Sequence, residues 1–89
     1  MRELLADDHL YAIAYYESRY RQFKEDGTPL ISPTDDVGVM QINKSTWLSK
    51  AKQMGLDIEH SEIDNITMAK YIRDVQGYNA WATNKLVHQ

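Results

Sequence analysis

Glu17 is the residue whose type and position most directly suggest chemistry. Leu10, Ile13, Ala14 and Glu17 fall at i, i+3, i+4 and i+7, so a helix would place all four on one face. An isolated charge on a buried face is costly in free energy. Burial therefore raises the pKa of a carboxyl group, and a carboxyl group with a raised pKa can act as a general acid at neutral pH. Glu17 is therefore a candidate acid catalyst. The alternative is a partly exposed side chain paired with one of the arginines that follow it.

A second chemical feature is the segment Gly-Val-Met-Gln-Ile-Asn at residues 38–43. Gly38 permits a positive φ or a close approach of the backbone to a ligand. Gln41 and Asn43 carry both hydrogen-bond donors and acceptors, which suit hydroxyl and acetamido groups. By itself the segment is typical of an ordinary turn into a helix, and the alternative is a surface that binds such groups.

The elements that must position these residues are predicted to be helical. Apolar periodicity predicts a first helix over 3–18, a second over 44–54 capped by Ser45 or Asn43, and a third over 64–76 capped by Asp64. The expected buried side chains of the second and third helices include Trp47, Leu48, Ala51, Met54, Ile66, Met68, Ala69, Ile72 and Val75.

The stretch between the first two helices reads differently. Residues 24–38 contain two prolines and two glycines, which predict a loop with short strands at most. A last short helical piece is expected around Ala80, Trp81 and Leu86. The fold class is thus mostly α, a small α+β helical domain with a short hairpin or loop after the first helix.

Composition bounds what such a chain can do. Its 89 residues allow one modest core, so we expect a single domain over 1–89. The net charge of −3 argues against a protein that follows nucleic-acid phosphates. Cysteine is absent and the histidines are scattered, so we expect no metal site and no cofactor. The longest apolar run falls short of the ~18 residues of a membrane span, and residues 1–8 do not form a signal peptide.

The order of these motifs resembles the soluble lytic transglycosylase domain, a lysozyme-like fold shared with goose-type lysozymes. The resemblance covers about residues 10–81 and rests on Glu17-Ser18, the loop Ser32-Pro33, the segment at 38–43, and Ser45-Thr46-Trp47. It departs from the family at Asp35-Asp36, where small or basic residues are usual, and it matches only partly at residues 77–81.

The resemblance implies a role for each matched residue. Glu17 stands at the catalytic acid/base. The implied substrate-binding residues are Ser18, Ser32, Met40, Gln41, Asn43 and, on the weaker C-terminal match, Tyr78. Asp35 and Asp36 are candidates for a second carboxylate, with turn residues as the alternative.

The resemblance also implies a substrate. It is the β-1,4 bond between N-acetylmuramic acid and N-acetylglucosamine in peptidoglycan glycan strands, cut in the cell envelope or outside the cell. Three alternatives stay open: a hydrolytic lysozyme using Asp35 or Asp36, a non-catalytic glycan-binding module of the same fold, and a helical interaction domain with chance motif matches. The chain is short for the family, so the floor of the cleft could be incomplete or shared with another domain. We expect a monomer, which could be part of a larger protein.

Overall fold

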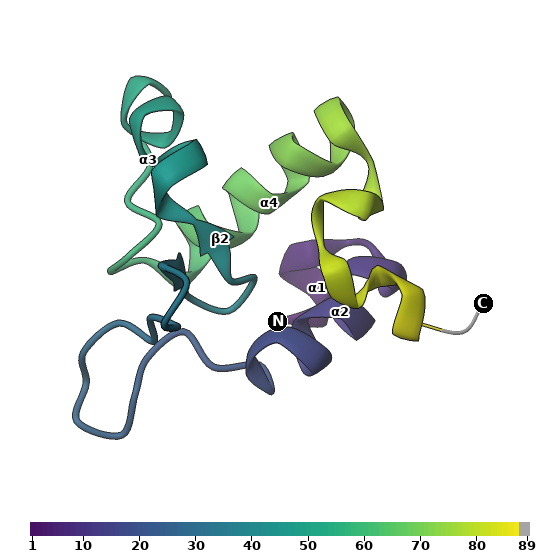
Figure 1. The fold of residues 1–89 in the computed structure, drawn as a ribbon, viewed down its shortest axis with the longest axis horizontal. Coiled ribbons are helices and arrows are strands. Elements are labelled where there is room, and N and C mark those ends of the chain that lie inside the picture. The colour runs from purple at the N-terminus through teal and green to yellow at the C-terminus, as the bar shows by residue number, and fades with distance from the viewer. Residues whose placement is uncertain (88–89) are drawn as a thin grey trace.

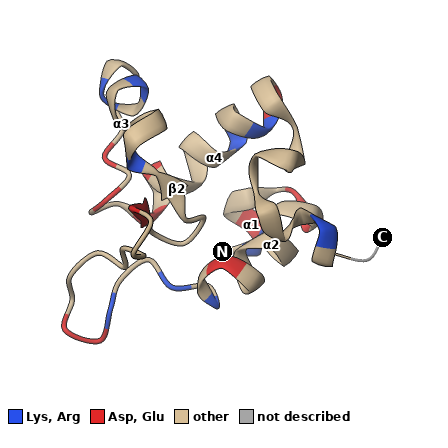
Figure 2. Ribbon diagram, viewed as in Figure 1, with Lys and Arg blue, Asp and Glu red and all other residues tan. Residues whose placement is uncertain are grey.

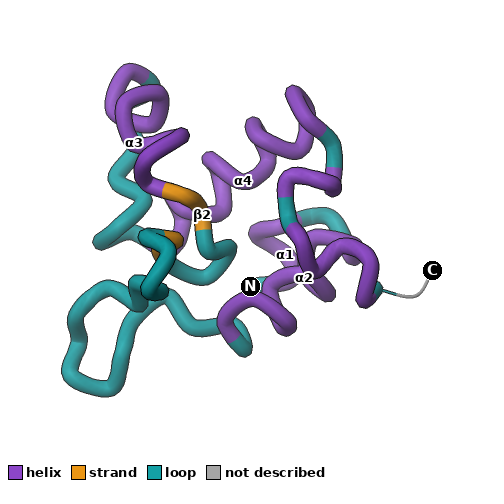
Figure 3. The backbone as a smooth tube through the Cα atoms, in the orientation of Figure 1, coloured by secondary structure: helices purple, strands orange, loops and turns teal. Residues whose placement is uncertain are grey.

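The computed structural model describes residues 1–87, which fold mainly into helices around a short hairpin (Figures 1 and 3). This confirms the predicted fold class. In chain order the elements are α1 (Arg2–Leu5), α2 (Asp8–Ser18), β1 (Asp36–Val37), β2 (Ile42–Asn43), α3 (Lys44–Gln53), α4 (Glu62–Gln76) and the 3₁₀ helices η1 (Tyr78–Ala80) and η2 (Ala82–Leu86).

The predicted first helix over 3–18 is wrong as a single element. Ala6 adopts a left-handed conformation with φ of 51°, which ends α1. Asp7 then caps α2, and its carboxylate accepts hydrogen bonds from the backbone N–H groups of His9 and Leu10 at 2.9 and 3.0 Å. A short acidic side chain that bonds to nearby backbone favours a helix start over a helix interior. The break therefore turns two acidic residues into the start of the helix that carries Glu17.

The later helices follow the sequence more closely. Asn43 caps α3, accepting from the Thr46 N–H at 3.0 Å, which decides between the two expected caps. The expected cap at Asp64 is wrong, because Ser61 caps α4 and Asp64 lies in its first turn. The prediction that Met54 and Val75 are buried is also wrong. Both side chains are exposed, because each lies at the C-terminal end of its helix.

The core joins α2 and α4 to the hairpin. Leu10, Ile13 and Ala14 of α2 are fully buried, as are Met68 and Ala69 of α4. β1 and β2 pair antiparallel, with Asp36 opposite Asn43 and Val37 opposite Ile42. Val39 and Met40, which lie between the two strands, are fully buried, so the turn of the hairpin points into the core rather than into solvent. None of the helices in residues 1–87 has both the length and the apolar character needed to cross a membrane.

Candidate active site

Glu17 is the penultimate residue of α2, and its side chain is half-buried. The Thr83 hydroxyl of η2 donates a hydrogen bond of 2.7 Å to Glu17 Oε2. In the described part of the chain no ion pair includes Glu17. The nearby arginines bond elsewhere: Arg19 donates to the Tyr15 hydroxyl and Arg21 to the Ser18 carbonyl. Pairing with an arginine is thus not the arrangement that the structure adopts.

The surroundings of Glu17 favour its neutral form. Burial is the largest influence and raises the pKa of its carboxyl group above the ordinary value of 4.5. The hydrogen bond from Thr83 opposes this rise, and the negative charge of Asp36 adds to it. A carboxyl group with a raised pKa and a neutral hydrogen-bond donor as its partner has the properties of a general acid.

Asp36 is held on β1 by three side chains. Ser32 and Thr34 donate to its Oδ2 at 3.1 and 2.6 Å, and Asn43 Nδ2 donates to its Oδ1 at 3.0 Å. Asp35 lies differently: its backbone is left-handed with φ of 66°, and its carboxylate is 4.0 Å from Lys44 Nζ. Of the two candidates for a second carboxylate, Asp36 is the one whose negative charge raises the pKa of Glu17.

Ser18 is buried and joins the end of α2 to the hairpin turn. Its hydroxyl donates to the Val39 carbonyl at 2.7 Å and accepts from the Arg21 N–H at 3.1 Å. This serine therefore fixes the position of the residue before it, Glu17, relative to the turn.

The hairpin turn is held by two buried side-chain amides, Gln22 and Asn65, which the sequence patterns did not predict as site residues. Gln22 Oε1 accepts from the Val39 N–H at 2.8 Å, and Asn65 Oδ1 accepts from the Met40 N–H at 3.0 Å. Gly38 has φ of 80°, and a Cβ atom there would lie within 2.6 Å of both polar atoms of the Gln22 amide. Glycine is needed because the amides approach the backbone where a side chain would be.

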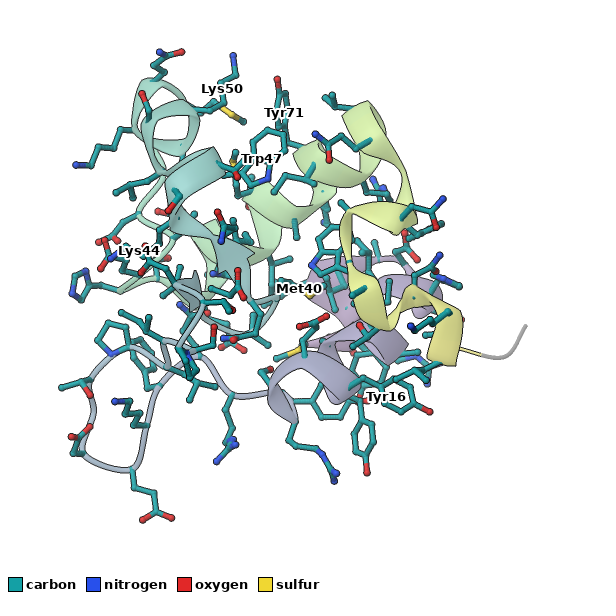
Figure 4. All side chains as sticks on the ribbon, viewed as in Figure 1. Tyr16, Met40, Lys44, Trp47, Lys50 and Tyr71 are labelled. Atoms are coloured by element: carbon teal, nitrogen blue, oxygen red, sulfur yellow. The ribbon has the colours of Figure 1, made fainter. Side chains whose placement is uncertain are left out.

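The other residues of the 38–43 segment differ in exposure. Met40 is fully buried and lies near the centre of the molecule (Figure 4). Gln41 is half-buried, and its Nε2 donates to the Gly38 carbonyl at 2.9 Å. Asn43 is half-buried and serves both as the cap of α3 and as a donor to Asp36. Asn43 is thus the residue of this segment that joins Ser32 as a hydrogen-bond donor to the Asp36 carboxylate.

Tyr78 does not join this group. Its hydroxyl donates to Asp7 Oδ2 at 2.7 Å, next to the bond from Arg73 Nη1 at 2.8 Å, and its ring packs on His9 at 4.2 Å between centroids. Burial alone would raise the pKa of Asp7, but the hydrogen bonds from Tyr78, the α2 backbone and Arg73 outweigh it and lower that pKa. Tyr78 therefore fastens η1 to the start of α2.

The aromatic residues divide between core and surface. Trp81 is buried, and its indole N–H donates to the Met40 carbonyl at 2.8 Å. Trp47 and Tyr71 meet edge to face between α3 and α4, with Lys50 above the Tyr71 ring (Figure 4). Tyr15 and Tyr16 are exposed on α2. Basic and acidic segments are spread over several elements (Figure 2), and no three His, Asp or Glu side chains of residues 1–87 come together as metal ligands would.

Of the residues that the sequence analysis did not single out, one carries a recognisable signal and one does not. Asn65 interrupts the apolar face of α4 as Glu17 interrupts that of α2, so the same pattern could have singled it out. Thr83 gives no such signal, because its contact with Glu17 joins residues 66 positions apart in the chain.

Comparison with known families gives one match. The family described as "Transglycosylase SLT domain" matches residues 2–81. Comparisons with curated proteins and with solved structures gave no match.

Proposed function

Because the chain belongs to the transglycosylase SLT domain family, we propose that it is a lytic transglycosylase with Glu17 as its acid/base. Its substrate would be the β-1,4 bond between N-acetylmuramic acid and N-acetylglucosamine in peptidoglycan. The observation that carries the proposal is the state of Glu17: half-buried, with a raised pKa, and bonded to a neutral hydroxyl. Membership of the family also removes the alternative of an interaction domain with chance motif matches.

The proposed reaction needs one carboxyl group in two roles. Glu17 first donates its proton to the glycosidic oxygen as the bond from that oxygen to the muramic acid C1 breaks. The carboxylate so formed then takes the proton of the muramic acid 6-hydroxyl, whose oxygen closes onto C1. The products are a 1,6-anhydro end and a free 4-hydroxyl, and Glu17 is again protonated.

The glycan strand is proposed to lie beside the hairpin that carries Asp36 and Asn43. Ser32, Gln41 and Asn43 are half-buried polar residues on or next to this hairpin, which supports a role in binding sugar. Ser18 would act by holding Glu17 in place, and buried Met40 by shaping the turn behind the sugar. Direct contact of Tyr78 with substrate has less support, since its hydroxyl is already bonded to Asp7.

One observation favours a second candidate, a hydrolytic lysozyme. Asp36 is ordered by three hydrogen bonds and its charge acts on Glu17, as a second carboxylate of a hydrolase would. In that reaction Asp36 would activate water and the product would carry a reducing end. Asp35 has less support, since its carboxylate faces Lys44.

The proposal extends to setting and assembly. The whole chain, 1–89, would act as one domain and as a monomer, on peptidoglycan strands of the cell envelope or outside the cell, with no cofactor. The same domain could be part of a larger protein.

Mass spectrometry of purified peptidoglycan after digestion tests the proposal, because it reports activity and product together. Fragments with 1,6-anhydro ends support the transglycosylase, and fragments with reducing ends support the lysozyme. Retention of the protein on peptidoglycan without any fragment would instead identify a glycan-binding module.

A further inference from the structure

Thr83 makes the one side-chain hydrogen bond to Glu17 among the described residues. The family match ends at residue 81, so Thr83 lies outside the stretch that the family defines. Its hydroxyl donates to Oε2 at 2.7 Å, the usual length of an O–H···O hydrogen bond.

The position of Thr83 is fixed from both sides. Two residues before it, the Trp81 indole donates to the Met40 carbonyl at 2.8 Å. The residue after it, Asn84, bonds through its side chain to His9 of α2 and to Asn79. η2 packs against α2, so these contacts hold the Thr83 hydroxyl over the end of the helix that carries Glu17.

We propose that Thr83 is a positioning residue for Glu17, holding Oε2 so that Oε1 is the oxygen presented to the glycosidic bond. This inference rests on the proposed function. The hydroxyl can donate to Oε2 while Oε1 carries the proton, and the same bond strengthens when Oε1 has given its proton away. Thr83 thus serves both the acid and the base form of one carboxyl group.

The electrostatic consequence has a defined sign. A hydrogen bond to the charged form lowers a carboxyl pKa, so Thr83 opposes burial and the negative charge of Asp36, both of which raise the pKa of Glu17. Removing the hydroxyl should raise that pKa further. Since a general acid must be protonated, the alkaline limb of the pH–rate profile should move to higher pH.

The test compares Thr83→Val, which removes the hydroxyl and keeps the shape, with Thr83→Ser, which keeps a hydroxyl. For Thr83→Val we expect kcat to fall roughly tenfold, the equivalent of one hydrogen bond to a charged group. We also expect the alkaline limb of the pH–rate profile to move to higher pH. Thr83→Ser should restore both values towards those of the wild type. Thr67→Val, an exposed threonine of α4 whose hydroxyl bonds the Ile63 carbonyl, is the matched control and should change neither.

A titration of the Glu17 carboxyl carbon by NMR separates this inference from the proposed function. If the wild type cuts no peptidoglycan, the proposed function fails, yet the titration still shows whether Thr83→Val raises the pKa of Glu17. An unchanged pKa and an unchanged alkaline limb in Thr83→Val would overturn the inference. Should Thr83→Val not fold, Thr83→Ala gives the same comparison with less bulk, and the same outcomes decide.

Discussion

The hydroxyl of Ser18 donates a hydrogen bond of 2.7 Å to the backbone carbonyl of Val39, 21 residues away. This contact joins the last turn of α2 to the turn of the hairpin, so Glu17 and the hairpin that bears Asp36 keep a fixed relation. Because the relation depends on side chains of known type, single substitutions can test it.

Glu17→Gln should abolish cleavage while keeping the fold. The amide has nearly the shape of the acid, but it can neither give nor take the required proton, a loss worth about 10²–10⁴-fold. The measurement is release of fragments from purified peptidoglycan, with circular dichroism as the check on folding. Near-wild-type release by this variant would remove Glu17 from the mechanism.

The stability of the protein should depend on pH through Glu17. Burial first, then the charge of Asp36, raises the pKa of Glu17 above 4.5, against the opposing bond from Thr83. The folded state therefore binds this proton more tightly than the unfolded state. The stability so contributed is complete below pH 4.5 and is lost as pH rises through the folded pKa.

Glu17→Gln lacks this titrating group. The difference in melting temperature, variant minus wild type, should therefore increase as pH rises from 4 towards 7. Thermal melts at several pH values measure the difference. Glu25→Gln, in an exposed part of the loop, is the control that should show no comparable gain. A constant difference between Glu17→Gln and wild type at every pH would contradict this expectation.

Asp36→Asn should lower the pKa of Glu17, because the variant removes a negative charge that raises it. The alkaline limb of the pH–rate profile should move to lower pH, opposite to the change expected for Thr83→Val. Asp35→Asn, which removes the same charge one residue earlier, should leave the limb in place.

Asp36→Asn also decides between the two candidate reactions. A transglycosylase should keep its activity and its 1,6-anhydro products in Asp36→Asn. In a hydrolase the same variant would lower the rate of cleavage by about 10²–10⁴-fold, the contribution of a general base. Reducing-end products that vanish in Asp36→Asn would make the chain a lysozyme.

Gly38→Ala should destabilise the fold far more than Gly27→Ala. Both glycines have positive φ, 80° and 87°, so both variants carry backbone strain of about 1 kcal/mol. At Gly38 the new Cβ would also collide with the Gln22 and Asn65 amides, whereas nothing lies within 4 Å at Gly27. Breaking those buried bonds should bring the cost to about 3 kcal/mol or more, measured by urea unfolding, and equal tolerance of the two changes would argue against this packing.

Local patterns predicted most of the fold. The apolar period located α3 and α4 to within about two residues, and the placement of prolines and glycines predicted the loop. The break at Ala6 was missed because the helical period continues across it, while Asp7 caps α2 through its own backbone contacts. The position of Ser61 as a cap was missed because Asp64, also a good capping residue, follows three positions later.

The sequence singles out Glu17 because this polar residue interrupts an apolar helical face, and its role as acid/base stays a prediction. Its partner Thr83 and the ordering of Asp36 by Ser32, Thr34 and Asn43 depend on how distant segments meet. Spacing along one helix cannot encode such contacts, so they emerge only from the folded chain.

The two buried amides that hold the hairpin turn have a consequence for the order of folding. The Val39 and Met40 N–H groups bond to side chains 17 and 25 residues away rather than to a neighbouring strand. Their hydrogen exchange with solvent should therefore be as slow as that of central α4, because the turn opens only when Gln22 or Asn65 detaches. Residues 38–40, which look like a loop, should then be among the last to close in refolding, when residues from three separate regions have come together.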